Sequence, residues 1–184
     1  MLICAYLWTA MCALWLIWAL RTKPTQSREG AASRLSYMAL IVVAYVLMFT
    51  RHAPGWLQLR LFTYEPSIQL LGVAITVAGL LFAVWARIYL GSNWSSAVTV
   101  KVGHELVRTG PYRWVRHPIY SGLVLAMLGT AIANREVQGV IALLLAFIGF
   151  SIKSRIEERA MISTFGAEYE EYSRNTGGIL PKLH

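Results

Sequence analysis

The chain has 184 residues, of which 57% are hydrophobic and 14% are charged. A soluble domain carries about 25% charged residues, so this composition excludes an ordinary soluble domain. The formal net charge of +8 at pH 7 could indicate a nucleic-acid partner. In an apolar chain, however, lysine and arginine also collect on one side of a membrane, and their positions decide between the two explanations.

Five apolar runs along the chain predict five membrane-spanning helices. The first covers residues 2–20 and has no formal charge, and about 20 such residues cross the hydrocarbon layer. Basic residues follow this run and none precedes it, which favours a retained helix over a cleaved signal peptide. The other runs cover approximately residues 35–50, 68–90, 119–133 and 137–152.

The last two runs are short, and sequence features at their ends predict how the helices lengthen. Only Asn134, Arg135 and Glu136 separate the two runs, which predicts the tip of a helical hairpin. Pro118 suits the first turn of a helix, so the fourth helix can begin there. The fifth can continue past Lys153 into water. Both extensions give these helices enough length to span the bilayer.

Small residues recur four positions apart on the third and fourth predicted helices. Gly79 and Ala83 form one stripe, and Gly122, Ala126 and Thr130 form another. Such stripes let helix backbones approach closely in lipid. We interpret them as packing surfaces.

The basic residues predict the orientation of the helices. With the N-terminus outside, the inside segments 21–34, 91–118 and 153–184 hold four, four and five lysines and arginines. The outside segments hold only Arg51, Arg60 and Arg135. Inside segments of membrane proteins carry this kind of excess. We therefore expect a multi-pass integral membrane protein with a cytosolic C-terminus, and we expect no nucleic-acid partner.

The connection 91–118 is too long for an ordinary structureless loop, which seldom exceeds about 12–15 residues. It contains Trp94, Tyr112 and Trp114, so we expect an ordered cap on the inside. The tail adds to it. Phe165 and Gly166 predict a helix end, after which a short second helix would pack over the cap through Tyr169 and Tyr172.

Motifs in the C-terminal half resemble those of a known family. They are Gly91-Ser92-Asn93-Trp94, His104-Glu105-Leu106-Val107-Arg108-Thr109-Gly110-Pro111-Tyr112, Arg116-His117-Pro118-Ile119-Tyr120-Ser121-Gly122, Glu157-Glu158-Arg159 and Phe165-Gly166-Ala167-Glu168-Tyr169-Glu170-Glu171-Tyr172. Arg-His-Pro alone is a weak signal. The ordered set, at this spacing and after membrane helices, is similar to the isoprenylcysteine carboxyl methyltransferase family over residues 91–181. The first two helices resemble that family only in hydropathy.

The resemblance implies an all-α polytopic membrane fold of about five transmembrane helices. A cytosolic cap would form from the 91–118 connection and the C-terminal helical tail. Residues 1–90 would hold membrane helices 1–3, and residues 91–184 would form the methyltransferase core. The resemblance also implies S-adenosyl-L-methionine as methyl donor, a lipophilic or prenylated substrate in the bilayer, and no metal. The short N-terminal half suggests a microbial protein of a prokaryotic plasma membrane.

The resemblance places cofactor contacts on the connection, the start of the fourth helix and the fifth helix. They are Thr99, His104, Glu105, Leu106, Val107, Tyr112, His117, Pro118, Ile119, Tyr120 and Glu157. Thr99 matches only through a gapped alignment. A substrate-contacting arginine of the family falls on Lys153, with Arg155 nearby, so either is a candidate catalytic residue that orients an anionic acceptor. This lysine in place of the family's arginine bears on the identity of the substrate more than on the identity of the cofactor.

The residue types suit the parts of this cofactor. Apolar side chains can enclose the purine, a helix N-terminus can hold the carboxylate, and tyrosine rings can face the sulfonium. The residues expected in these roles are Leu106, Val107 and Ile119 for the purine, His117 for the carboxylate, Glu157 for the ammonium or a ribose hydroxyl, and Tyr112 and Tyr120 for the sulfonium. The chain contains no G-x-G-x-x-G motif, so a soluble dinucleotide-type pocket is absent from the sequence.

Several alternatives stay open on the sequence alone. The acceptor could be an isoprenylated cysteine carboxylate, another small carboxylate or thiol, or a phospholipid amine. An NADPH-dependent enzyme of the sterol-reductase type shares an Arg-His-Pro-x-Tyr-x-Gly region, and a non-enzymatic membrane scaffold could keep the same fold. Arg116 has a simpler interpretation as a topology anchor, and His117 as a helix-entry residue.

Overall fold

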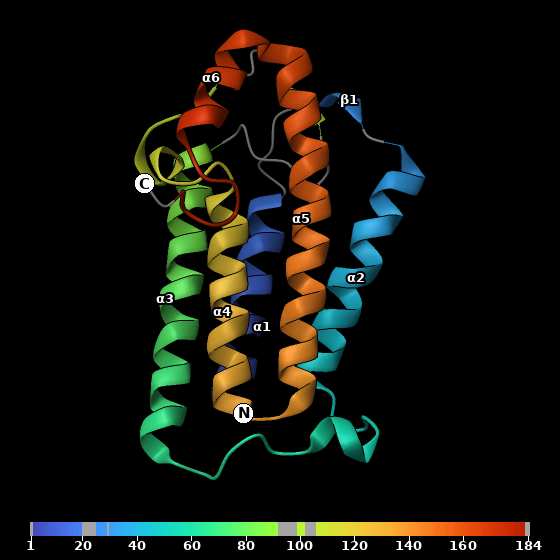
Figure 1. The fold of residues 1–184 in the computed structure, drawn as a ribbon, viewed down its shortest axis with the longest axis vertical. Coiled ribbons are helices and arrows are strands. Elements are labelled where there is room, and N and C mark those ends of the chain that lie inside the picture. The colour runs from blue at the N-terminus through green and yellow to red at the C-terminus, as the bar shows by residue number, and fades with distance from the viewer. Residues whose placement is uncertain (1, 20–24, 29, 92–98, 102–105, 183–184) are drawn as a thin grey trace.

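The computed structural model describes residues 2–19, 25–28, 30–91, 99–101 and 106–182, and for 25–28 and 99–101 the backbone alone. Five long helices form a bundle (Figure 1). They are α1 (Leu2–Ala19), α2 (Ala31–Phe49), α3 (Pro66–Leu90), α4 (Pro118–Asn134) and α5 (Val137–Phe165). The five-helix prediction is confirmed, including the start of the fourth helix at Pro118 and the end of the fifth at Phe165.

Four of these helices, α1, α2, α3 and α5, are long and apolar enough to cross a membrane. Helix α4 begins at Pro118 as expected, but it has only 17 residues, about 25 Å of helix. The expectation that this start would bring the fourth helix to the full thickness of the hydrocarbon layer was therefore wrong. Helix α5 has 29 residues, about 44 Å, and therefore extends beyond that layer, as predicted. The chain is a multi-pass membrane protein.

Helices α3 and α4 make the most extensive contact in the bundle. Four glycines meet there, Gly72 and Gly79 from α3 with Gly122 and Gly129 from α4, and we call this contact the small-residue seam. A Cβ atom on Gly72 would lie 2.6 Å from the Ala133 backbone nitrogen and 2.7 Å from the Gly129 carbonyl oxygen. No side chain fits at that separation. The predicted stripes meet in the same contact, because a Cβ on Gly79 would clash with the Ala126 backbone and one on Gly122 with the Ala83 backbone, so they are packing surfaces.

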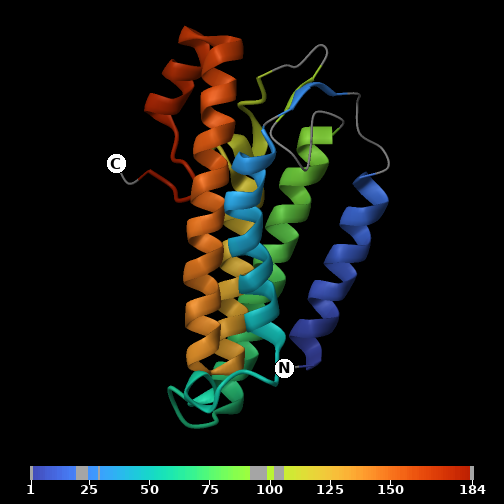
Figure 2. The ribbon, with the colours of Figure 1, turned by 90° about the vertical axis from the view of Figure 1, so that its right-hand side faces the viewer.

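A buried polar contact ties three helices together within the bundle. The Trp8 indole of α1 donates a 3.0 Å hydrogen bond to the Thr130 hydroxyl of α4, which lies 3.2 Å from the Thr76 hydroxyl of α3. In an apolar environment these groups are costly to leave unpaired, so the contact fixes how the helices meet. Helix α1 otherwise lies at the edge of the bundle (Figure 2).

Segments far apart in sequence share one end of the bundle, which we call the cap end. Strands β1 (Thr25–Arg28) and β2 (Thr99–Lys101) pair antiparallel there, and the 3-10 helix η3 (Gly110–Arg113) and helix α6 (Ala167–Asn175) lie at the same end (Figure 1). All three segments predicted to lie inside thus come together. The short tail helix is confirmed, and its Tyr169 and Tyr172 are buried. The two strands were not predicted.

The opposite end, which we call the far end, holds the connection between α2 and α3, with the 3-10 helix η1 (Gly55–Gln58), and the α4–α5 turn. Residues 134–136 form the tip of a helical hairpin, as expected. Backbone hydrogen bonds join the two connections, from the Leu61 N–H to the Arg135 carbonyl at 2.8 Å and from the Val137 N–H to the Leu59 carbonyl at 3.1 Å.

Candidate functional site

His117 is the last residue before α4, where Pro118 occupies the first helical turn. Its imidazole is buried between two consecutive carboxylates of α5. Nε2 lies 3.0 Å from an oxygen of Glu158, and Nδ1 lies 3.4 Å from an oxygen of Glu157. Both ring nitrogens therefore have an acidic partner, which fixes the plane of the ring.

These partners set the protonation of the site. Burial disfavours the charged imidazole, but hydrogen bonds and charge from Glu157 and Glu158 outweigh that cost and raise the pKa of His117 above its ordinary value of 6.5. Burial, and next the charge on Glu157, raise the pKa of Tyr112. At neutral pH the structure therefore presents a phenol at Tyr112 and favours a protonated His117.

Tyr120 lies one helical turn after His117 and joins it to α5. The two rings stack with centroids 5.6 Å apart, and Tyr120 also stacks on Phe150 at 5.1 Å. The Tyr120 hydroxyl donates a 2.6 Å hydrogen bond to Glu157. Tyr120 is thus held from both faces and at its hydroxyl. We call His117, Tyr120, Lys153, Glu157 and Glu158 the polar corner.

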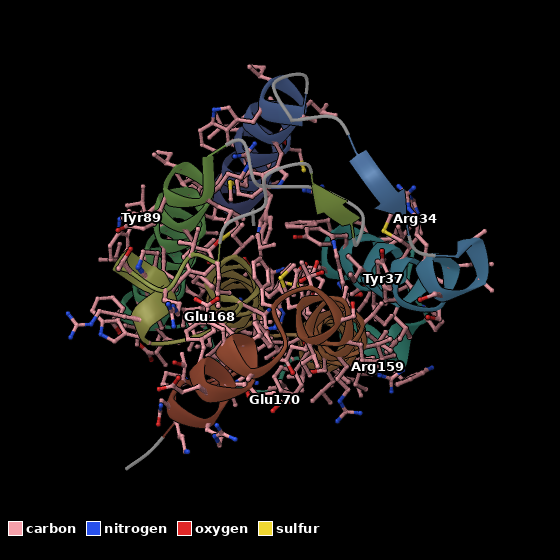
Figure 3. All side chains as sticks on the ribbon, turned by 90° about the horizontal axis from the view of Figure 1, so that it is seen from above. Arg34, Tyr37, Tyr89, Arg159, Glu168 and Glu170 are labelled. Carbon is pink, nitrogen blue, oxygen red and sulfur yellow. The ribbon has the colours of Figure 1, made fainter. Side chains whose placement is uncertain are left out.

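Lys153 completes the polar corner from one turn earlier on α5. Its Nζ lies 4.0 Å from a Glu157 oxygen, as their spacing of four residues predicts. It also lies 5.4 Å from the ring centroids of Tyr120 and of Tyr37 on α2. In the view from the cap end, Tyr37 and Tyr89 lie on opposite sides of the bundle (Figure 3). The lysine is therefore on the α2 side, where α2, α4 and α5 meet.

An apolar cluster adjoins the polar corner on the α3 side. Tyr112 and Ile119 are buried together with Ala86 of α3, and Val107 packs against them. Tyr120 packs against this cluster and also against the main core, so it lies between apolar and charged surroundings. Helix α3, the segment 107–112 and the first turn of α4 thus build one wall.

Hydrogen bonds from Arg116 join the C-terminal segment to the N-terminal end of α4. Arg116 donates from Nε to Glu158 at 2.8 Å, and from Nη1 to the Ser173 carbonyl at 2.9 Å and to the Thr176 carbonyl. Its backbone N–H donates to the Gly177 carbonyl at 2.8 Å. Arg116 therefore links three elements in addition to any role as an anchor.

The structure brings most of the predicted site residues together and places others elsewhere. The structure brings together Val107, Tyr112, His117, Pro118, Ile119, Tyr120, Lys153 and Glu157. Leu106 is partly buried beside Val107, whereas Arg155 is exposed and, two positions from both Lys153 and Glu157, faces away from the polar corner. Thr99 begins β2, opposite Arg28, and β2 contacts α5. His104 and Glu105 lie outside the described residues.

Three residues that contact the predicted site residues were not predicted as part of the site. They are Glu158, Phe150 and Tyr37. Glu158 was noticed only as part of a motif, yet it contacts both Arg116 and His117. Phe150 and Tyr37 lie inside apolar runs, where nothing in the sequence distinguishes them from other span residues. A signal for Glu158 existed, since consecutive glutamates directly after a membrane span need cationic partners nearby.

Comparison with known proteins places this fold and site in a family. A family model described as phospholipid methyltransferase matches residues 68–168, more than half of the chain. The chain belongs to this family. The match begins in α3 and ends in α6, so it includes the small-residue seam and the polar corner.

Individual relatives agree with the predicted resemblance, which is confirmed. Protein-S-isoprenylcysteine O-methyltransferase of Saccharomyces cerevisiae is 33% identical over 67% of this chain and 54% of its own length. The protein of the same name from Homo sapiens is 30% identical over 73% of this chain and 48% of its own length. The chain thus spans about half the length of these curated relatives.

A solved structure supports the fold independently. The eukaryotic intramembrane Ras methyltransferase, isoprenylcysteine carboxyl methyltransferase, superposes with a TM-score of 0.57 at 24% identity. The superposition covers 79% of this chain and 52% of that chain. The all-α membrane fold predicted from the sequence is therefore confirmed, with a short two-stranded sheet as an addition. The division of the chain at residue 90 stays a prediction.

Proposed function

We propose that the protein transfers a methyl group from S-adenosyl-L-methionine to a lipophilic carboxylate, most specifically an isoprenylcysteine-like acceptor. The observation that carries this proposal is the polar corner beside an apolar cluster, in which the Lys153 ammonium lies 4.0 Å from Glu157, the carboxylate that also accepts the Tyr120 hydrogen bond. Family membership and the names of the relatives support the same activity.

The residues present fit the proposed cofactor in kind. Val107, Tyr112 and Ile119 form an apolar wall suited to a purine, and Leu106 adjoins it. His117 and the first turn of α4 suit a carboxylate, because helix N-termini favour anions. Glu157 suits an ammonium group or a ribose hydroxyl. When bound, S-adenosyl-L-methionine supplies an electrophilic methyl group on a sulfonium cation.

The chain's own task in this chemistry is alignment. An ionised carboxylate is already a nucleophile, so no general base is required. Holding two reactants in line contributes up to about 7–11 kcal/mol in favourable cases. Stacking between His117 and Phe150 and the hydrogen bond to Glu157 hold Tyr120 rigid, which preserves the shape of the site.

Lys153 suits an anionic acceptor better than Arg155 does. Its ammonium is largely buried between two tyrosine rings and beside Glu157, whereas Arg155 is exposed on another face of α5. A phospholipid amine is the second candidate acceptor, because the family description names phospholipid methyltransferases. It is protonated at neutral pH, so a neighbouring lysine would repel it. We therefore favour the carboxylate.

We further propose that the cap end faces the cytosol. The described parts of the three segments that together hold thirteen lysines and arginines meet there. The acceptor's lipid tail would then reach the site from the inner leaflet, past α2 and α5, while the cofactor enters from water. A prokaryotic plasma membrane is the proposed location.

Methyl transfer by the purified chain tests this proposal. The protein in detergent would receive methyl-labelled S-adenosyl-L-methionine and one of three acceptors, N-acetyl-S-farnesylcysteine, its carboxamide, or phosphatidylethanolamine. We expect a base-labile ester on the carboxylate alone. Label on the amine lipid, or equal label on the carboxamide, would contradict carboxyl methylation.

Substitution of Lys153 tests the acceptor side. Lys153→Ala should lower turnover of the carboxylate roughly tenfold or more, while affinity for S-adenosylhomocysteine stays within about twofold. Arg155→Ala is the matched control, because it removes the same charge from another face of α5 and should leave both quantities near wild type. Equal losses of turnover and cofactor affinity in Lys153→Ala would remove its acceptor role.

A further inference from the structure

The far end of the bundle has a feature that methyl transfer at the cap end does not use. An open pocket of about 410 Å³ lies between the α2–α3 connection and the α4–α5 turn. Its lining residues are Arg60, Phe62, Thr63, Tyr64 and Arg135. It therefore combines two cations, two hydroxyl groups and two aromatic rings, and none of its lining residues is acidic.

The walls of this pocket are held by the backbone. The N–H of Leu61 donates to the Arg135 carbonyl at 2.8 Å, and Arg60 and Glu136 form an isolated antiparallel bridge. Arg135 itself has a φ of 61°, the left-handed region that is uncommon for a residue other than glycine. The α4–α5 turn therefore holds the backbone of Arg135 in this conformation, and the Arg135 side chain lines the pocket.

The side chain of Arg135 lacks the partners that a buried cation needs. Its guanidinium lies 4.9 Å from the Tyr64 ring centroid. Nε and Nη1 are buried and have no hydrogen-bond partner, and no ion pair in the described part of the chain includes Arg60 or Arg135. Arg135 therefore has no carboxylate partner in that part of the chain, and an open pocket lined by this cation together with Arg60 is suited to an anion.

Nearby carboxylates do not satisfy the two arginines. Glu136 follows Arg135 in the chain, but one of its oxygens accepts a 2.7 Å hydrogen bond from Gln138, and it does not line the pocket. Glu65 follows Tyr64 and precedes the first turn of α3 without lining the pocket. Within the described ranges, no carboxylate therefore forms an ion pair with either arginine of the pocket.

The surroundings of the pocket place it at the level of lipid headgroups. Trp56, Leu59 and Leu61 on the same connection are 60%, 61% and 52% exposed. Exposed tryptophan and aliphatic side chains at the end of a membrane bundle lie at the membrane–water interface. Phosphate groups are the anions of that region, and arginine binds them through paired N–H donors.

We propose that this pocket binds a phosphate group, with Arg60 and Arg135 as its cationic ligands and Thr63 as a hydroxyl donor. The phosphate belongs either to an anionic phospholipid of the leaflet at the far end or to free inorganic phosphate. Phe62 and Tyr64 form the apolar side against which the glycerol of a lipid would rest. The site is separate from the polar corner and does not depend on methyl transfer.

Thermal unfolding of the full chain in detergent tests the site with three probes. They are phosphatidylglycerol, the diacylglycerol with the same acyl chains, and inorganic phosphate. Arg135→Asn and Arg60→Gln remove one charge each, and asparagine tolerates the left-handed conformation of residue 135. Arg51→Gln is the matched control, because Arg51 is an exposed cation at the same end that does not line the pocket.

We expect phosphatidylglycerol to raise the unfolding temperature in a saturable way and diacylglycerol to have no such effect. Half-saturation should need roughly tenfold more phosphatidylglycerol in Arg135→Asn and in Arg60→Gln, and be unchanged in Arg51→Gln. Inorganic phosphate acting with the same dependence on the two arginines would support the site and identify the free ion as its ligand. Equal stabilisation by diacylglycerol, equal loss in Arg51→Gln, or no stabilisation by any probe would overturn the proposal.

Discussion

Helix α4 makes two unlike contacts along its length. Toward α3 it packs through the small-residue seam, where the two backbones approach so closely that a Cβ atom on any of the four glycines would clash with the other helix. At its entrance, toward α5, His117 and Tyr120 meet charged and hydrogen-bonded groups of the polar corner. The seam is non-directional and fixes where α4 lies. The polar corner is directional and depends on that position.

The seam should be the more sensitive of the two to added volume. A Cβ on Gly72 would lie 2.6 Å from backbone of α4, which cannot move without displacing the helix. We expect Gly72→Ala to lower the free energy of unfolding by about 3 kcal/mol, the upper end for overpacking. Denaturation in mixed micelles measures it.

Gly55→Ala is the control for this substitution, because a Cβ there would have no atom within 4 Å. Its unfolding free energy should stay within about 0.5 kcal/mol of wild type. A seam variant as stable as this control would mean that α3 and α4 do not pack as closely as described.

The polar corner should respond to the loss of a single ionic partner. Arg116→Ala removes the donor to Glu158 and to two tail carbonyls, and leaves Glu158 with only His117 as a described partner. We expect a loss of about 2 kcal/mol, since hydrogen bonds to charged groups contribute about 1.5–3 kcal/mol. Limited proteolysis should also release the tail.

Arg108→Ala is the matched control for that variant. Arg108 and Glu168 form an equally short ion pair of 2.7 Å, but both side chains are about half exposed. The loss should be below about 0.5 kcal/mol, as for exposed pairs. Equal losses in the two arginine variants would mean that burial at the polar corner adds nothing to the interaction.

The smallest expected effect is a pH dependence of stability through His117. Its pKa is raised in the folded protein, so its stabilising contribution is fully present below pH 6.5 and is lost as the pH rises through the raised pKa. Thermal unfolding of wild type and His117→Gln across pH 6–9 measures it. The difference between them should shrink toward high pH, and a constant difference would contradict the raised pKa.

The sequence predicted features that depend on neighbouring residues better than contacts between separate helices. Apolar run length and local signals such as Pro118 and Gly166 are properties of neighbouring residues, so helix bounds followed from them closely. The four-residue stripes likewise predicted part of the seam, Gly79 and Gly122, but not Gly72 and Gly129. The strands could not be predicted, because β1 is four polar residues without apolar alternation.

For the candidate site, the motifs predicted which residues come together, but not which side chains contact each other. Lys153 with Glu157 follows from helical spacing. The contact of His117 with Glu158, about 40 positions away, and that of Lys153 with Tyr37, more than 100 away, depend on how separate helices dock. The local sequence can indicate that Glu158 needs a cationic partner, but it does not specify which residue that partner is.

Titration calorimetry tests the central claim, that the polar corner with its apolar wall holds S-adenosyl-L-methionine. The full chain in detergent would be titrated with S-adenosylhomocysteine and with NADPH, alongside monodisperse Glu157→Gln. We predict a dissociation constant on the order of micromolar for S-adenosylhomocysteine, at least roughly tenfold weaker binding in the variant, and no binding of NADPH. Binding of NADPH alone, of neither molecule, or of S-adenosylhomocysteine equally by variant and wild type would contradict the account.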